Sequence, residues 1–222
     1  MGLSVLEIWN GALGLSGTRT DINSLTERSR EAELCTQWYP IVRRRVLASA
    51  HWAEASQSAR LAVLAERTNV EWTSAEPSPP WTFAYAWPSD MIAPRYLTDY
   101  SRFECGQFDN KRAILSDTAN AVVTYTKDET STGLWTTWLE NAVMYGLAAM
   151  IIRPLSGSSR KTQELIAEAN NNIMLAREMN GSLYEAPMDW LPDWISARGY
   201  SNVPSPNRFI YQVGPLLSAG VA

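Results

Sequence analysis

The spacing of apolar residues changes along this chain, and that change constrains the fold more than any single motif does. Residues 1–76 and 130–182 carry apolar side chains at helical spacing, whereas residues 77–129 carry short runs rich in β-branched and aromatic residues. From residue 183 to 222 the chain is too rich in proline for a regular helix. The pattern predicts an α+β chain: a mainly helical bundle, a small antiparallel β unit inserted into it, and an extended C-terminal arm.

Helices are expected on both sides of the β unit. The first should cover residues 3–15 and the second residues 26–50, where Pro40 should kink or split the helix because proline has no N–H to donate. A third, shorter helix is expected over residues 52–65.

The helix expected after Gly133 is apolar on almost every side. Such a helix must be buried, either at the centre of the bundle or against a neighbouring subunit. Pro154 is expected to end it, and a last helix should cover residues 160–179.

The β unit is expected to begin after a proline-rich linker at residues 76–80. The clearest strand is the last, because Val122, Val123 and Tyr125 are residue types that favour strands. The expected strands cover residues 81–86, 91–97, 101–106, 113–115 and 121–126.

Composition narrows the class of protein. A net charge of -4 and a pI near 5.1 argue against a main surface that grips nucleic acid. Cys35 and Cys105 belong to no metal-binding or redox motif and are expected to be free thiols in a reducing cytosol. The longest apolar run, residues 142–152, is shorter than the roughly 20 residues that a spanning helix needs, so no membrane association is expected.

The arm, residues 183–222, combines its prolines with large aromatic side chains. Tryptophan and tyrosine are favoured anchors at protein interfaces, so the arm is expected to become ordered on a partner. The alternative is that the arm folds back on its own domain. The candidate anchors are Trp190, Trp194, Phe209 and Tyr211.

Short motifs of small apolar and aromatic residues occur in a definite order along residues 3–180. The helical part before the β unit carries Ala12-Leu13-Gly14-Leu15, Ser24-Leu25, Glu31-Ala32, Tyr39-Pro40, Val42-Arg43 and Val46-Leu47-Ala48-Ser49-Ala50-His51-Trp52. The remainder carries Trp81-Thr82-Phe83-Ala84-Tyr85-Ala86, Pro88-Ser89-Asp90-Met91, Tyr125, Trp135, Leu139 and Leu147-Ala148-Ala149. This order resembles the tail tubular protein A family, the gatekeeper-type head-to-tail adaptors of T7-like short-tailed bacteriophages.

The resemblance implies a structural protein of the virion neck, made in the host cytoplasm, and not an enzyme. It implies a ring, a dodecamer in this family, that joins the portal protein ring to the tail nozzle protein and extends the DNA channel. Genomic DNA would pass without sequence-specific binding, and tail fibres are a further partner. We expect subunits to stay monomeric until the portal ring provides a template on which apolar faces and the arm become buried.

Arg43, Arg44 and Arg45 form the only run of three cations. One interpretation is a helix face that contacts acidic residues of a neighbouring subunit; the other is a patch that lines a DNA channel. Subunit contact is the favoured interpretation, because DNA must slide through such a channel.

Catalytic candidates are few, and we expect no catalytic residue, metal or cofactor. His51 is the only histidine and is expected at a helix end, where a capping role is ordinary. A hydrolase using His51 or a carboxylate pair, Asp189 with Asp193 or Glu104 with Asp109, is the alternative from another class. The other alternative is a different connector, such as a head-completion or tail-terminator protein.

Overall fold

The computed structural model describes residues 2–18, 20–68, 75–157 and 159–181. These residues form two compact units, and each is considered by itself. The helical unit contains the described residues up to Ala55 and from Asp128 onward, and the β unit contains those of Ser56–Lys127. The predicted α+β class, helices with antiparallel sheets, is confirmed.

Local sequence signals set the ends of the helices. Ser4 and Glu7 form a capping box before the first helix, with a Ser4 N–Glu7 Oε2 distance of 2.7 Å. The side chains of Ser29 and Thr136 accept hydrogen bonds from the first turns of the second and third helices. The α-helices are α1 (Val5–Ser16), α2 (Arg30–Ser49), α3 (Thr137–Ser156) and α4 (Ser159–Gly181), with 3₁₀ turns η1 (Ala53–Ala55) and η2 (Thr132–Leu134).

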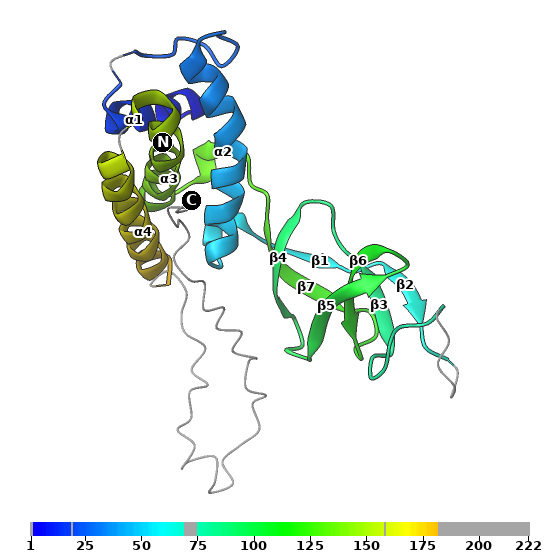
Figure 1. Cartoon of the computed structure of the whole chain (residues 1–222). Coiled ribbons are helices and arrows are strands. Elements are labelled where there is room, and N and C mark those ends of the chain that lie inside the picture. The colour runs from blue at the N-terminus through cyan, green and yellow to red at the C-terminus, as the bar shows by residue number, and fades with distance from the viewer. Residues whose placement is uncertain (1, 19, 69–74, 158, 182–222) are drawn as a thin grey trace, which may run out of the picture. The chain divides into compact units, whose positions relative to one another are not determined.

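Helix α3 lies at the centre of the helical unit. It packs against α1, α2 and α4, as its apolar circumference predicts (Figure 1). Gly146 permits a close approach to α2, because a Cβ at this position would lie 2.8 Å from Val42 Cγ1. The predicted burial of this helix is confirmed, and its surroundings are the other helices of the same chain.

Two prolines that were expected to interrupt helices do not do so. Helix α2 continues through Pro40 from Arg30 to Ser49, so the predicted split is wrong. Helix α3 continues past Pro154 to Ser156 and ends where Gly157 takes a left-handed conformation (φ 65°). Tertiary packing explains the first case, since Tyr39 and Val42 are buried on either side of the proline.

The helix predicted over residues 52–65 is also wrong. Only the short turn η1 is helical there, and the chain then forms β1 (Ser56–Arg60) and β2 (Val63–Glu66). Their hydrogen-bond partners are β7 and β3, so long-range pairing overrides a weak local preference. The β unit therefore begins at Ser56, not at residue 77, and ends at Lys127, two residues before the expected boundary.

The β unit is built from two antiparallel sheets, one of three strands (β1-β7-β4) and one of four (β2-β3-β6-β5). Residues from both sheets, among them Tyr85, Leu97, Ile114 and Tyr125, form one hydrophobic core. The later strands match the predicted ones closely. They are β3 (Phe83–Ala86), β4 (Met91–Leu97), β5 (Phe103–Phe108), β6 (Lys111–Ser116) and β7 (Val122–Lys127).

Substitution of glycine by alanine should have opposite effects at two helical positions. Gly146→Ala should lower the melting temperature, because overpacking against the stiff Val42 side chain costs roughly 1–3 kcal/mol and exceeds the ~1 kcal/mol gain in helix propensity. Gly14→Ala in α1 should raise the melting temperature, because alanine favours the helix and a Cβ at this position meets no atom within 4 Å. Thermal unfolding followed by circular dichroism measures both changes, and a stabilised Gly146→Ala variant would contradict the close approach.

Candidate interaction sites

An ionic contact lies where the chain returns from the β unit to the helical unit. Asp128 directly follows β7, and its Oδ1 accepts hydrogen bonds from Arg43 Nε (3.1 Å) and Nη2 (2.7 Å) of α2. Asp128 Oδ2 accepts a third from Arg44 Nε (2.8 Å). The Arg43 guanidinium also lies 5.8 Å from the centre of the Tyr39 ring. Asp128 is therefore fixed to α2 by two cationic side chains.

The two arginines contribute differently to this contact. The Arg43 side chain is 10% exposed and that of Arg44 is 64% exposed. A charge as deeply buried as Arg43 is stable only with its partner in place, whereas an exposed pair contributes little.

The electrostatic environment of Asp128 favours its ionised form. Partial burial by itself raises the pKa of this carboxyl, but the hydrogen bonds and positive charges of Arg44 and Arg43 outweigh it. The net result is a pKa below the ordinary value for aspartate.

The three arginines of the predicted cationic run thus have different surroundings in the structure. Arg43 serves an internal contact, Arg44 presents most of its side chain to solvent, and Arg45 is half-buried. No sequence signal pointed to Asp128 as the partner, since it lies 85 positions from Arg43. The prediction that these arginines contact a neighbouring subunit or line a channel stays a prediction, and Arg44 has the free surface for it.

A buried amide joins the end of α4 to the segment that follows α2. Asn180, which is 7% exposed, donates from Nδ2 to the carbonyl of His51 (2.6 Å) and accepts at Oδ1 from the N–H of Ala53 (3.0 Å). Trp52 is fully buried between these two residues, and its Nε1 donates to the Val46 carbonyl (2.9 Å). We call the two hydrogen bonds made by the Asn180 side chain the Asn180 clamp.

His51 lies just beyond the end of α2, as predicted, because the helix ends at Ser49 with Ala50 as its C-cap. Its carbonyl is held by the Asn180 clamp. The contact uses the main chain of residue 51 and not its imidazole ring.

Several large apolar side chains of the helical unit are exposed. On the last turns of α4, Met174 is 58% exposed, and Leu175 and Met179 are each 40% exposed. We call these three residues the α4 patch. Others lie on α2, η2 and α3; they are Ile41, Leu134 and Trp138. Contiguous exposed apolar patches mark protein contacts, whereas scattered apolar side chains are normal on a protein surface. In α4 the exposed side chains of Arg177 and Glu178 lie among the apolar ones.

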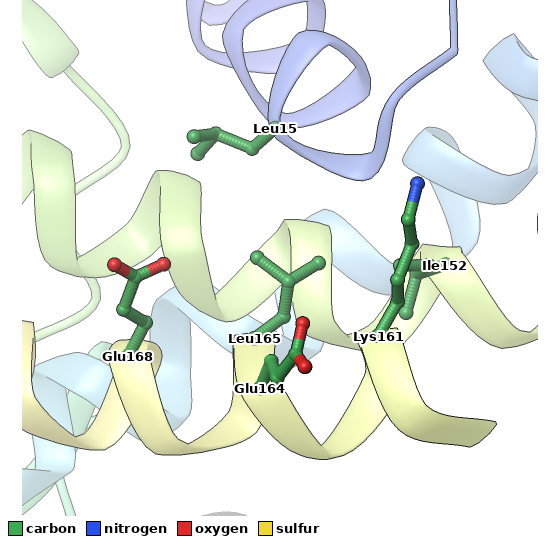
Figure 2. A pocket seen from close by; sticks show the side chains of 6 residues that line it. All are labelled: Leu15, Ile152, Lys161, Glu164, Leu165 and Glu168. Atoms are coloured by element: carbon green, nitrogen blue, oxygen red, sulfur yellow. The ribbon is translucent and has the colours of Figure 1, made fainter. Parts of the chain in front are cut away.

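A small open depression lies between α1, α3 and α4 (Figure 2). Leu165 of α4 points toward α1, where Leu15 lies across the depression, and Lys161, Glu164 and Glu168 of α4 and Ile152 of α3 complete the lining. Its volume is about 170 Å³, below the roughly 300–1,000 Å³ of ordinary small-molecule sites. The depression is better suited to one protein side chain than to a substrate.

Of the two described carboxylate candidates, Glu104 has a structural partner and Asp109 lies in a turn. Glu104 accepts a hydrogen bond from Trp81 Nε1 (2.8 Å), and Asp109 occupies the left-handed turn between β5 and β6 (φ 49°). Across residues 2–18, 20–68, 75–157 and 159–181, no group of three or more His, Cys, Asp or Glu side chains is placed to hold a metal ion.

Both cysteines are free thiols, as predicted. Cys35 is fully buried, and this burial, with the nearby Glu31 charge, raises the pKa of its thiol to about 12. A thiol that stays protonated at neutral pH is a poor nucleophile, so Cys35 serves packing. In the described part of the chain, no helix combines the length and apolar character needed to cross a membrane.

The remaining predicted residues lie outside the described residues. These are the arm anchors and the second carboxylate pair, namely Trp190, Trp194, Phe209, Tyr211, Asp189 and Asp193.

No protein-family model and no curated protein sequence matches this chain.

Substituting the two arginines singly should separate a buried contact from an exposed one. Arg43→Met should lower the free energy of unfolding by roughly 2–4 kcal/mol, because it removes two of the three hydrogen bonds to the partly buried Asp128 carboxylate. Arg44→Met should change it by only about 0–1 kcal/mol, as for other exposed pairs. Urea unfolding followed by helical circular dichroism gives both values, and equal effects would contradict the assigned difference.

The stability that Asp128 contributes should disappear in acid. A carboxyl whose folded-state pKa is lowered stabilises the protein fully above its unfolded-state pKa of about 3.9, and loses that contribution as pH falls through the folded-state pKa. The difference in unfolding free energy between the native chain and Asp128→Asn should therefore be constant from neutral pH to about pH 5 and shrink below about pH 4. Urea midpoints measured across this range test it, and a difference that grows in acid would contradict it.

Proposed function

We propose that this protein is a head-to-tail adaptor of a short-tailed bacteriophage, a ring subunit that joins the portal ring to the tail nozzle and extends the DNA channel. The supporting observation is the architecture. A helical unit is interrupted by an antiparallel β unit, which is the arrangement implied by the resemblance over residues 3–180. The function is geometric, in that one chain presents surfaces to its own copies and to two different rings.

The surface of the helical unit supports assembly into a ring. Large apolar side chains on α2, α3 and α4 are exposed although the unit already has a well-buried central helix. Contact with neighbouring copies would bury such side chains, and interface anchors are commonly Trp, Met and Arg. Ile41 and Trp138 are candidates for these contacts, together with the exposed Arg44.

The charge of the chain suits a DNA channel. With a net charge of -4, the chain has no general attraction for a polyanion. Only weak contact is compatible with DNA that must slide during ejection. Phosphate contacts from an exposed arginine such as Arg44 would be local and independent of sequence.

The arm, residues 183–222, is proposed to dock on the portal ring through Trp190, Trp194, Phe209 and Tyr211. Large aromatic side chains supply most of the binding energy in interfaces where one short segment lies on a folded partner. In this proposal the portal ring is the template that turns soluble subunits into a ring.

Portal rings encoded by the same genome should capture this chain as a second ring. Negative-stain imaging of the chain alone should show monomers, and imaging with portal rings should show portal particles capped by a ring of matching symmetry. A monomer that ignores the portal ring would contradict the adaptor function. Stable rings that form in the absence of the portal would contradict only the proposal that the portal ring acts as a template for assembly.

The arm supplies the control for this experiment. A chain that lacks residues 183–222 should keep its helical circular dichroism and lose capture by the portal ring. Capture by a different purified virion ring, with none by the portal, would instead identify a head-completion or tail-terminator connector.

A further inference from the structure

The edges of the two sheets in the β unit are not equally protected. Among the described strands, the four-stranded sheet ends at β2 and β5, and the three-stranded sheet ends at β1 and β4. An edge strand exposes main-chain N–H and C=O groups that can pair with another chain, and proteins usually protect such edges with proline, charge or bulges. Strand β4 carries Pro94 and two register shifts, so its edge is protected.

Strand β5 lacks this kind of protection. Its six residues pair with β6 in one continuous register, and they include no proline and a single charged residue, Glu104. The turn between β5 and β6 is formed by Asp109 and Asn110, both with positive φ, as in a two-residue hairpin. Counted from this turn, alternate residues face β6, so the main-chain groups of Cys105 and Gln107 face away from it. Strand β5 therefore offers a regular edge for pairing.

The opposite edge of the same sheet, β2, is short and has exposed apolar side chains. Val63 is 51% exposed and Leu64 is 42% exposed. On the side of β3, Ala62 accepts a main-chain hydrogen bond (2.8 Å) and Arg67 donates one (2.7 Å). The adjacent residues, Val63 and Glu66, therefore direct their main-chain groups away from β3.

The strand directions allow the four-stranded sheet of one copy to continue into that of the next. This sheet is antiparallel throughout and has an even number of strands, so β2 and β5 run in opposite directions. A rotation axis roughly along the strands preserves their directions and sets β2 of the next copy antiparallel to β5. The three-stranded sheet has an odd number of strands, so the same rotation would set its edges parallel, which is the slightly less stable pairing.

The charges at the two edges are complementary. Strand β5 has Glu104 near its start, and Arg67 follows the last residue of β2. One antiparallel register sets Cys105 opposite Glu66 of a second copy. The same register sets Glu104 opposite Arg67, so opposite charges meet and like charges do not. A guanidinium has five donors, so the contact of Arg67 with the Pro80 carbonyl (3.3 Å) leaves donors for this carboxylate.

We propose that copies of this chain join head to tail by strand addition, with β5 of one copy pairing with β2 of the next. The four-stranded sheets then form one continuous antiparallel sheet. The inference rests on the proposed function in one respect, the closure of many copies into a ring, which a head-to-tail contact produces when its rotation closes. Strand β2 contributes only four residues, so a single contact is weak, as expected for assembly that needs a template.

A disulfide between the two edges tests the contact directly. Residues opposite each other in a hydrogen-bonded antiparallel pair have Cα atoms about 5.5 Å apart, which is within disulfide range. Cys105 is exposed and Cys35 is buried, so Glu66→Cys gives each full-length copy one accessible thiol at either edge. Oxidation with copper phenanthroline should link the copies into a ladder of multimers on a non-reducing gel.

Three further variants serve as controls. Gln57→Cys is the matched one, because it places an exposed thiol on β1, an edge of the other sheet. Its multimers should be about tenfold or more scarcer, since only strand pairing raises the effective concentration of the two thiols. Cys105→Ser added to Glu66→Cys should abolish the ladder. Gln107→Pro added to Glu66→Cys should also abolish it and leave the circular dichroism unchanged, because it removes a donor that faces away from β6.

Oxidation of the concentrated free chain, and of portal rings incubated with it, separates this contact from the adaptor function. Capture by the portal without a ladder would overturn the strand pairing and leave the adaptor function in place. A ladder in the free chain without capture would support the pairing and contradict the adaptor function. Neither ladder nor capture would overturn both. Dimers without larger species in the native chain, whose exposed thiol is Cys105, would show two β5 edges meeting about a two-fold axis and would also overturn the head-to-tail pairing.

Discussion

The Asp128 carboxylate, held by Arg43 and Arg44, connects two stretches of chain that the β unit separates. Helices α1 and α2 precede the β unit, α3 and α4 follow it, and the helical unit exists only if the second stretch returns to the first. The Arg43–Asp128 pair fixes the return, and the Asn180 clamp fixes the residues that lead out of α2. Both contacts satisfy polar groups that would be costly to bury alone. The central position of α3 depends on this return of the second stretch of chain to the first.

The parts of the fold that follow local rules could be predicted from the sequence. Helical periodicity identified the four α-helices, and β-branched and aromatic runs identified β3 to β7. Strands β1 and β2 could not be predicted, because their residues lack a strong strand pattern and pair with residues far along the chain, such as Ser56 with Thr126. Pro40 and Pro154 were misjudged for the opposite reason. A local rule predicted an interruption, but both helices continue through the proline, and at Pro40 the nearby Tyr39 and Val42 are buried.

The candidate interaction sites were less predictable than the fold. The arginine run was visible in the sequence, but its division into a buried Arg43 and an exposed Arg44 depends on a partner 85 positions away. The α4 patch was not foreseen, because periodicity indicates which residues can share a helix face and not whether anything covers them. Met174 and Leu175 flank the buried Ile173 and Ala176, so only the exposed fractions distinguish them. Long-range contacts and solvent exposure are the two quantities that the sequence pattern lacks.

The insertion of the β unit also determines the order in which the chain can fold during its synthesis. The ribosome delivers α1 and α2 first, but their main packing surface, α3, is encoded after the whole β unit. The β unit has a core of its own and is complete once β7 has emerged. It can therefore fold while the two leading helices still lack α3. A late event of synthesis is then the packing of α3 against α1 and α2, which were made much earlier, followed by the addition of α4. Apolar surface on α1 and α2 is accessible to chaperones until α3 arrives.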